Sequence, residues 1–299
     1  MEWLRERLDD PNSVFVPVWQ SRVLVFDGPA PRAVYVKRRD IEQVLMNDEE
    51  ALFLGEEDDR GFFAVEIEGE NSALPPSLEQ LGRFRDLRAV GPLLSKKDGA
   101  ILAYAKTLTF WHGRNHFCGV CGSPTINCEG GHFRKCSNSG CEAVHFPRTD
   151  PAIIVLIHRG EKCLLARQPG WPDRMYSVLA GFVEPGESAE AAVVREAFEE
   201  AGVHVREIYY QSSQPWPFPC SLMLAFRAEA EDEQVRLGDK ELEEARWFSA
   251  EDLKREVEVG AVRLPSRISI AYHLLEDWFD GVSVSHLSDL AGTNAYRMK

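Results

Sequence analysis

Three glutamates, Glu196, Glu199 and Glu200, carry the clearest chemistry in this chain, because they recur at intervals of three and four residues. On a helix this spacing places all three carboxylates on one face. Crowded carboxylates repel one another and raise each other's pKa values, and a hard divalent cation such as Mg²⁺ or Mn²⁺ removes that repulsion. Such a cation can bridge phosphate oxygens and prepare a water nucleophile. A solvated acidic helix face is the alternative interpretation, and Arg195 is placed to pair with Glu199 or Glu187.

A second reactive group is a block of cysteines in the middle of the chain. Its members follow a C-x2-C knuckle and a wider second pair, and they are Cys118, Cys121, Cys136 and Cys141. Four thiolates at such spacing suit tetrahedral Zn²⁺ in a zinc ribbon, and a full thiolate set leaves no open position for water. The sequence therefore predicts structural zinc. Cys128 is a competing ligand, and His132 or His145 could substitute.

The glutamate helix belongs to a longer pattern, Gly-x5-Glu-x7-Arg-Glu-U-x-Glu-Glu-x-Gly-U, in which U is aliphatic. The matching residues are Gly181, Glu187, Arg195, Glu196, Glu199, Glu200, Gly202 and Val203, with a small Ala197 at the first U position. This pattern resembles the Nudix box. The resemblance implies an α/β/α Nudix sandwich and substrates in which a nucleoside diphosphate is linked to another group.

A further segment narrows the range of possible substrates. Ser213–Pro219 reads SQPWPFP, a proline-pinned loop whose aromatic side chains could stack on flat rings. After a Nudix box and a four-cysteine ribbon, this segment resembles the NADH pyrophosphatase family, over about residues 115–280. The resemblance implies hydrolysis of NADH or NAD⁺ to nicotinamide mononucleotide and AMP. It leaves open the removal of NAD caps from RNA 5′ ends, and it implies a homodimer.

The same resemblance assigns roles to individual residues. The implied Mg²⁺ or Mn²⁺ ligands are Ala180 through its carbonyl, Glu196, Glu199, Glu200 and Glu241, with Glu244 as a rival to Glu241. The implied catalytic residues are Glu196, Glu199 and Glu200, with Glu199 or Glu200 as general base. The implied substrate contacts are Arg88, Phe146, Phe182, Gln214, Pro215, Trp216, Pro217, Phe218, Pro219, Cys220, Ser221 and Ala271. Two positions depart from the family pattern: Phe146 stands where tyrosine is usual, and Gly131 stands where a glutamate is expected.

Hydrophobic patterning indicates the elements that must position these residues. The expected strands are 13–18, 22–26, 33–36, 62–67, 152–158, 162–167, 176–179, 207–211 and 221–228. The expected helices are 77–89, 99–111, 188–201, 249–255 and 268–279, and residues 49–60 are expected to form an acidic loop. Ser188 as N-cap and Gly202 just past the end mark the limits of the glutamate helix.

These elements predict an α/β (α+β) chain of three blocks. We expect an N-terminal mixed α/β domain (1–112, Nudix-like), a zinc ribbon (113–147), a Nudix α/β/α sandwich (148–285) and a C-terminal tail (286–299). A length of 299 residues suits two domains with a small insert.

Composition excludes several classes of function. The formal charge of −14 disfavours a non-specific nucleic-acid binder. No apolar run reaches the length of a membrane span, and the first ten residues lack the apolar core of a secretory signal, so a reducing cytoplasmic location is expected. Two other functions stay open: a zinc-ribbon regulatory or RNA-binding protein with a nucleotide-sensing Nudix domain, or a hydrolase of another nucleoside diphosphate such as ADP-ribose.

Overall fold

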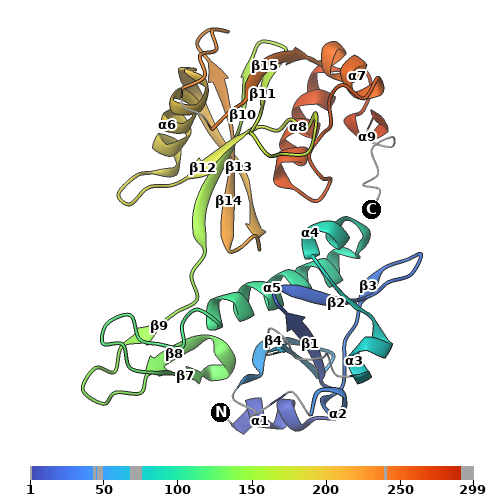
Figure 1. The fold of residues 1–299 in the computed structure, drawn as a ribbon. Coiled ribbons are helices and arrows are strands. Elements are labelled where there is room, and N and C mark those ends of the chain that lie inside the picture. The colour runs from blue at the N-terminus through green and yellow to red at the C-terminus, as the bar shows by residue number, and fades with distance from the viewer. Residues whose placement is uncertain (1, 43–44, 46–49, 68–75, 239–240, 291–299) are drawn as a thin grey trace. The chain divides into compact units, whose positions relative to one another are not determined.

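A computed structural model of the chain describes all residues except 1, 43–44, 46–49, 68–75, 239–240 and 291–299 (Figure 1). The chain divides into two compact units, and each is described by itself. The first comprises Met1–Thr149 with Pro217–Cys220, and the second comprises Asp150–Trp216 with Ser221–Lys299.

The first unit is built on a six-stranded sheet of order β3-β2-β1-β5-β4, with β6 added beside β2. Its strands are β1 (Val14–Trp19), β2 (Arg22–Phe26), β3 (Arg32–Ala33), β4 (Leu52–Glu57), β5 (Arg60–Glu66) and β6 (Arg83–Arg85). Its helices are α1 (Glu2–Asp9), α2 (Arg38–Ile41), α3 (Pro76–Leu81), α4 (Leu87–Val90), η2 (Gly91–Leu93) and α5 (Lys96–His112). The long helix α5 starts at Ser95, whose hydroxyl accepts the Asp98 N–H at 3.0 Å, and it packs Leu102, Ala105 and Leu108 against the sheet.

The cysteine block forms a separate three-stranded sheet of order β7-β8-β9 within the first unit. Its elements are β7 (Thr125–Cys128), η3 (Glu129–Gly131), β8 (Phe133–Cys136) and β9 (Val144–His145). A buried network joins this sheet to the end of α5: Arg134 donates to Nδ1 of His112 at 3.0 Å and to Oγ1 of Thr125 at 2.7 Å. Nε2 of His112 contacts the Gly131 carbonyl at 2.9 Å. Burial lowers the pKa of His112 to about 4, so the imidazole is neutral and can serve both partners.

The second unit is a layered α/β domain. Its sheet has the order β13-β14-β10-β11-β15, with β12 beside β10. Its strands are β10 (Asp150–Arg159), β11 (Lys162–Arg167), β12 (Leu179–Phe182), β13 (Val205–Trp216), β14 (Ser221–Ala230) and β15 (Glu244–Ser249). Its helices are α6 (Ala189–Ala201), α7 (Ala250–Glu258), α8 (Ile270–Val282) and α9 (Leu287–Leu290).

Strand β10 shows why this sheet is covered on both faces. Ile153, Val155 and Ile157 belong to the core shared with α6, whereas Ile154 and Leu156 belong to the core shared with α7 and α8. Side chains alternate between faces along a strand, so a continuous apolar run is a strand buried on both sides. Figure 1 shows α6 on one side of the sheet and α8 on the other, which confirms the predicted α/β/α sandwich.

Four sequence predictions of secondary structure are wrong. The expected strand over 33–36 keeps only Ala33, in β3, and an isolated bridge between Val36 and Phe15. The expected helix over 77–89 is two short helices, α3 and α4, separated by strand β6. Residues 52–57 of the expected acidic loop form strand β4, while residue 49 lies outside the described residues. The expected strand over 176–179 starts later, as β12, and only Ser177 makes an isolated bridge to Ala166.

In the described residues, the helices fall short of the length and apolar character needed to cross a bilayer.

Candidate active site

Helix α6 presents the glutamates in a defined register. Ser188 caps its start by accepting the Ala191 N–H at 3.1 Å, and Gly202 ends it in the left-handed conformation, with a φ of 66°. Both ends were predicted from the sequence. Ala192, Val193, Ala197 and Ala201 bury the opposite stripe of the helix against the sheet. This packing leaves Glu199 exposed, Glu196 partly buried and Glu200 at only 4% exposure.

Arg195 organises the acidic residues around it. Its guanidinium donates to both carboxylate oxygens of Glu187 at 2.9 Å, to Glu196 at 2.8 Å and to Glu199 at 3.1 Å. The same side chain donates to the Phe182 carbonyl at 2.9 Å, which ties α6 to β12. The predicted pairing with Glu199 and Glu187 is therefore confirmed, and these charge-assisted bonds hold the pKa of Glu187 below its usual range.

Glu196 lies directly over a glycine of the box. A Cβ at Gly181 would stand 1.9 Å from the Glu196 carboxylate, so any side chain at 181 would displace that carboxylate. Burial is the main cause that raises the pKa of Glu196, and the charges of Glu199 and Glu241 add to it, while Arg195 opposes them. Glu241 therefore lies within electrostatic range of Glu196 although it follows 45 residues later.

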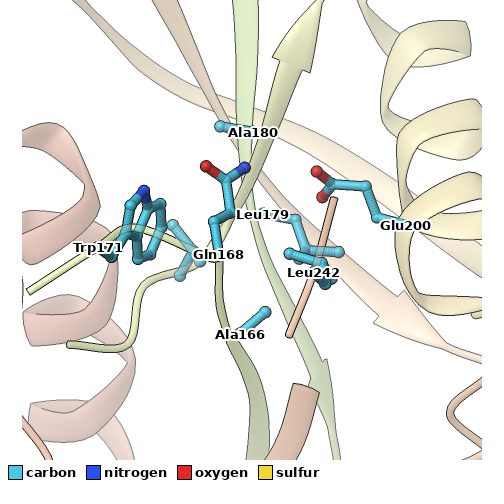
Figure 2. A pocket seen from close by; sticks show the side chains of 8 residues that line it. Ala166, Gln168, Trp171, Leu179, Ala180, Glu200 and Leu242 are labelled. Atoms are coloured by element: carbon cyan, nitrogen blue, oxygen red, sulfur yellow. The ribbon is translucent and has the colours of Figure 1, made fainter. Parts of the chain in front are cut away.

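Glu200 lines a small pocket near the end of β11 (Figure 2). The pocket is lined by Ala166, Gln168, Trp171, Val178, Leu179, Ala180, Glu200 and Leu242. Ala180, whose carbonyl the family resemblance implies as a metal ligand, thus lines the same pocket as Glu200. Leu242 places the chain segment next to Glu241 at this pocket as well.

Glu244, the rival to Glu241, faces the other side of the sheet. Its carboxylate accepts a hydrogen bond from the Tyr176 hydroxyl at 2.5 Å, and Arg246 lies 3.7 Å away. Tyr176 and Phe248 belong to the core on the α7 and α8 side. Because Glu244 and Phe248 are four residues apart on one strand, they share that face, away from α6. Glu244 as a ligand beside the α6 glutamates is therefore contradicted.

The donor set fits a hard divalent cation. Glu196, Glu199, Glu200 and Glu241 offer carboxylate oxygens, and the space under Glu196 that a Cβ would fill is kept open by Gly181. In the described part of the chain, only the cysteines bring three or more metal-ligating atoms within 4.8 Å of one another. The carboxylates stay further apart, as expected for like charges held by a single arginine.

The ribbon brings together the four predicted thiolates. The Sγ atoms of Cys118, Cys121, Cys136 and Cys141 lie within 4.8 Å of one another, a donor set that suits tetrahedral zinc. In the described residues this group includes neither Cys128, whose Sγ points to the Ile126 carbonyl at 3.8 Å, nor His132. His145 contacts the Cys118 sulfur through Nε2 at 3.3 Å instead of replacing a cysteine. Hydrogen bonds, first from the Val120 N–H, lower the pKa of the Cys118 thiol to about 6.

The SQPWPFP segment is less loop-like than its prolines suggest. Strand β13 continues through Trp216, and only Pro217–Cys220 turn back into β14, with a cis peptide bond between Phe218 and Pro219. The Gln214 carboxamide donates to the Ile268 carbonyl at 2.7 Å and accepts the Ile270 N–H at 2.8 Å. Gln214 is therefore bound to the start of α8, a contact between distant segments that no sequence motif indicates.

Within the first unit, two cations lie over the ring of Phe218. The Arg88 guanidinium is 4.6 Å from the ring centre, and the Lys106 ammonium is 5.3 Å away. Arg88 was implied by sequence resemblance, whereas buried Lys106 was missed because it looks like any residue on an amphipathic helix.

The remaining implied substrate residues differ in accessibility. Phe182 and Phe146 are exposed and free to offer their ring faces, although Phe146 also contacts Phe133. Pro215 and Pro219 are exposed, Trp216 and Cys220 are half-buried, and Pro217 is buried. Ala271 and Ser221 are buried as well, at 5% and 8% exposure, so only a small part of either could touch a ligand.

Comparisons with known proteins agree with this geometry. Residues 148–265 match the NUDIX domain, and residues 12–111 match the NADH pyrophosphatase-like rudimentary NUDIX domain. The chain is 37% identical to the NAD-capped RNA hydrolase NudC of Mycobacterium bovis, over 87% of this chain and 83% of that protein. It is 37% identical to Nudix hydrolase 19, chloroplastic, of Arabidopsis thaliana, over 87% and 66%. It is 33% identical to the NAD-capped RNA hydrolase NUDT12 of Macaca fascicularis, over 93% and 69%.

Proposed function

Because the chain belongs to the Nudix hydrolases that combine a NADH pyrophosphatase-like domain with a Nudix domain, we propose that it hydrolyses the pyrophosphate bond of NAD(H). The products are nicotinamide mononucleotide and AMP. The same cleavage at an NAD-capped RNA 5′ end is the second substrate we propose, since two similar proteins carry that activity in their names.

The observation that carries this proposal is the intact arrangement around Arg195. One guanidinium holds three glutamates of the box, and Gly181 leaves room for the Glu196 carboxylate. A protein that only sensed nucleotides would not need this acidic geometry. Retention of the whole group therefore favours an enzyme over a regulatory or RNA-binding module, and the SQPWPFP segment favours NAD(H) over ADP-ribose.

A divalent cation fits this site, and we propose that Glu196, Glu199, Glu200, Glu241 and the Ala180 carbonyl hold it. When bound, Mg²⁺ or Mn²⁺ supplies charge neutralisation for the diphosphate. Zn²⁺ on Cys118, Cys121, Cys136 and Cys141 has a structural role, since four thiolates fill its coordination shell.

The protein's own side chains orient the acidic residues, bind the substrate and accept the proton. Arg195 keeps Glu196 and Glu199 oriented, and exposed Phe182 stacks on a flat ring of the dinucleotide. Glu200 accepts the proton of the attacking water, because its carboxylate is withdrawn from solvent and lines the pocket beside Ala180. Glu199 is the alternative base, but it is more exposed and bound by Arg195.

The test is turnover of NADH with Mn²⁺, followed by chromatography of the products. We expect two nucleoside monophosphates, loss of turnover on chelation, and loss of turnover in Glu200→Gln. NADH that binds but is not cleaved in the presence of Mn²⁺ would establish the binding-module interpretation. A parallel reaction with an NAD-capped oligonucleotide tests the second substrate, and kcat/KM for the two ranks them.

We also propose a homodimer in a reducing cytoplasmic compartment, on the family resemblance and on seven cysteines without a disulfide in the described residues. Light scattering at micromolar concentration tests the dimer. A monomer at that concentration would contradict it.

A further inference from the structure

Gln168 is a polar residue at the active-site pocket that the Nudix pattern does not contain. It follows the last residue of β11, and its backbone is fixed from two sides. The Glu243 N–H donates to the Arg167 carbonyl at 2.9 Å, and the Arg167 guanidinium donates to the Glu243 carboxylate at 2.8 Å. The backbone N–H of Trp171 donates to the Gln168 carbonyl at 3.3 Å and closes a turn. The Gln168 side chain therefore extends from a backbone that these hydrogen bonds hold in place.

The carboxamide of Gln168 points into the pocket that Glu200 lines. Figure 2 shows it between the indole of Trp171 and the carboxylate of Glu200, below Ala180. Among the residues that the structure describes, the carboxamide has no hydrogen-bond partner. A half-buried amide that is aimed at a carboxylate and makes no internal bond is available to something that enters the pocket.

The pocket has the size for water and not for a nucleoside. Its volume is about 30 Å³. Small-molecule sites start at roughly 300 Å³, whereas one water occupies about 30 Å³. Side chains of Ala166, Val178, Leu179 and Leu242 make most of its wall apolar. A water that enters is thus directed to the polar atoms of Glu200 and Gln168.

We propose that Gln168 is a positioning residue for the water that attacks the diphosphate. This proposal rests on the proposed hydrolase function. The water donates one hydrogen to the Glu200 carboxylate and accepts a hydrogen bond from Nε2 of Gln168, which Figure 2 shows on the side of Glu200, so its second lone pair is left for the attack. A new O–P bond forms, the bridging P–O bond breaks, and the water's proton moves to Glu200. The bridging electron pair leaves on the second monophosphate. A glutamine orients the attacking water in some GTPases by the same logic.

Trp171 has a separate part in this arrangement. Its ring forms the wall beside Gln168 that faces away from Glu200 (Figure 2). An apolar wall limits the pocket to few waters and strengthens the hydrogen bonds inside it. We expect the ring to matter and its N–H to matter little, so Trp171→Phe keeps most of the activity.

The test compares Gln168→Met with wild type. Methionine has nearly the same shape but makes no strong hydrogen bond. We expect kcat for NADH to fall about 10- to 100-fold, as for loss of one group that orients a reactant, with KM within about twofold. Gln168→Asn keeps the amide but retracts it by one methylene, so kcat should fall there too without a folding defect. Gln234→Met, at an exposed loop, is the matched control.

Two binding measurements distinguish a role of Gln168 in positioning the water from a role in binding the metal or the nucleotide. Mn²⁺ affinity by electron paramagnetic resonance and AMP affinity by calorimetry should both match wild type in Gln168→Met. Unchanged kcat in both Gln168 variants would refute the proposal, as would a rise in KM alone or a loss of Mn²⁺ affinity. Absence of NADH cleavage by the wild type would instead refute the proposed function.

Discussion

Replacing Gly181 by alanine is the sharpest perturbation of the acidic site. The new Cβ would stand 1.9 Å from the Glu196 carboxylate, and real Cβ contacts essentially never fall below 3.0 Å, so the carboxylate must retreat by at least about 1.1 Å. It is the end of a flexible side chain, and the backbone of Gly181 is outside the left-handed region, so the fold accepts the change. A displacement of about 1 Å in a catalytic group can lower a rate about 100-fold, and we expect a loss of that size in kcat.

Stability should hardly change in Gly181→Ala. The partly exposed Arg195–Glu196 pair that is disturbed is worth about 0.5–1 kcal/mol, and a gain of about 0.4–1 kcal/mol from the stiffer unfolded chain offsets it. The assays are NADH turnover with Mn²⁺ and thermal unfolding. Gly281→Ala is the control, because a Cβ there meets nothing within 4 Å. Full activity in Gly181→Ala would refute the claim that the position of the Glu196 carboxylate is essential.

Three other substitutions test neighbouring parts of the account. Arg195→Lys loses the fork that holds Glu187, Glu196 and Glu199 at once, so kcat/KM should fall about 10-fold or more while the protein still folds; steady-state kinetics that match wild type would contradict this. The raised pKa of Glu196 means that ionising it opposes folding as the pH rises from the unfolded pKa to the folded one. Metal-free Glu196→Gln should therefore melt higher than wild type at pH 8 and equally near pH 4, and a scan with chelator that shows no gain at pH 8 would argue against burial of that carboxylate. Cys118→Ser should lower the zinc content from one ion per chain and the melting temperature together, as measured by elemental analysis and calorimetry, and a variant with full zinc would remove Cys118 from the ligand set.

Local signals explain why the glutamate helix was predicted to the residue. The N-cap residue, the C-terminal glycine and the spacing of the glutamates all lie within one continuous segment, from Ser188 to Gly202. The four cysteines were also found together as predicted, since a thiolate set has few structural uses at that spacing.

Contacts between distant segments explain what the sequence did not reveal. Strand β6 interrupts an apparent helix because its residues pair with β2, where Val23 lies opposite Arg85. Strand β4 was hidden because its exposed end is acidic, although Leu52 is buried. Gln168 belongs to no sequence motif, and its proposed role can be inferred only because the fold places it in the same pocket as Glu200.

The most direct test of the central claim is cleavage of NADH in ¹⁸O-water with mass spectrometry of both products. Attack by a water on the pyrophosphate predicts one ¹⁸O atom per cleavage, carried by one of the two monophosphates, and no label in Glu200→Gln at matched times. Release of free nicotinamide with ADP-ribose, or monophosphates without label, would contradict it.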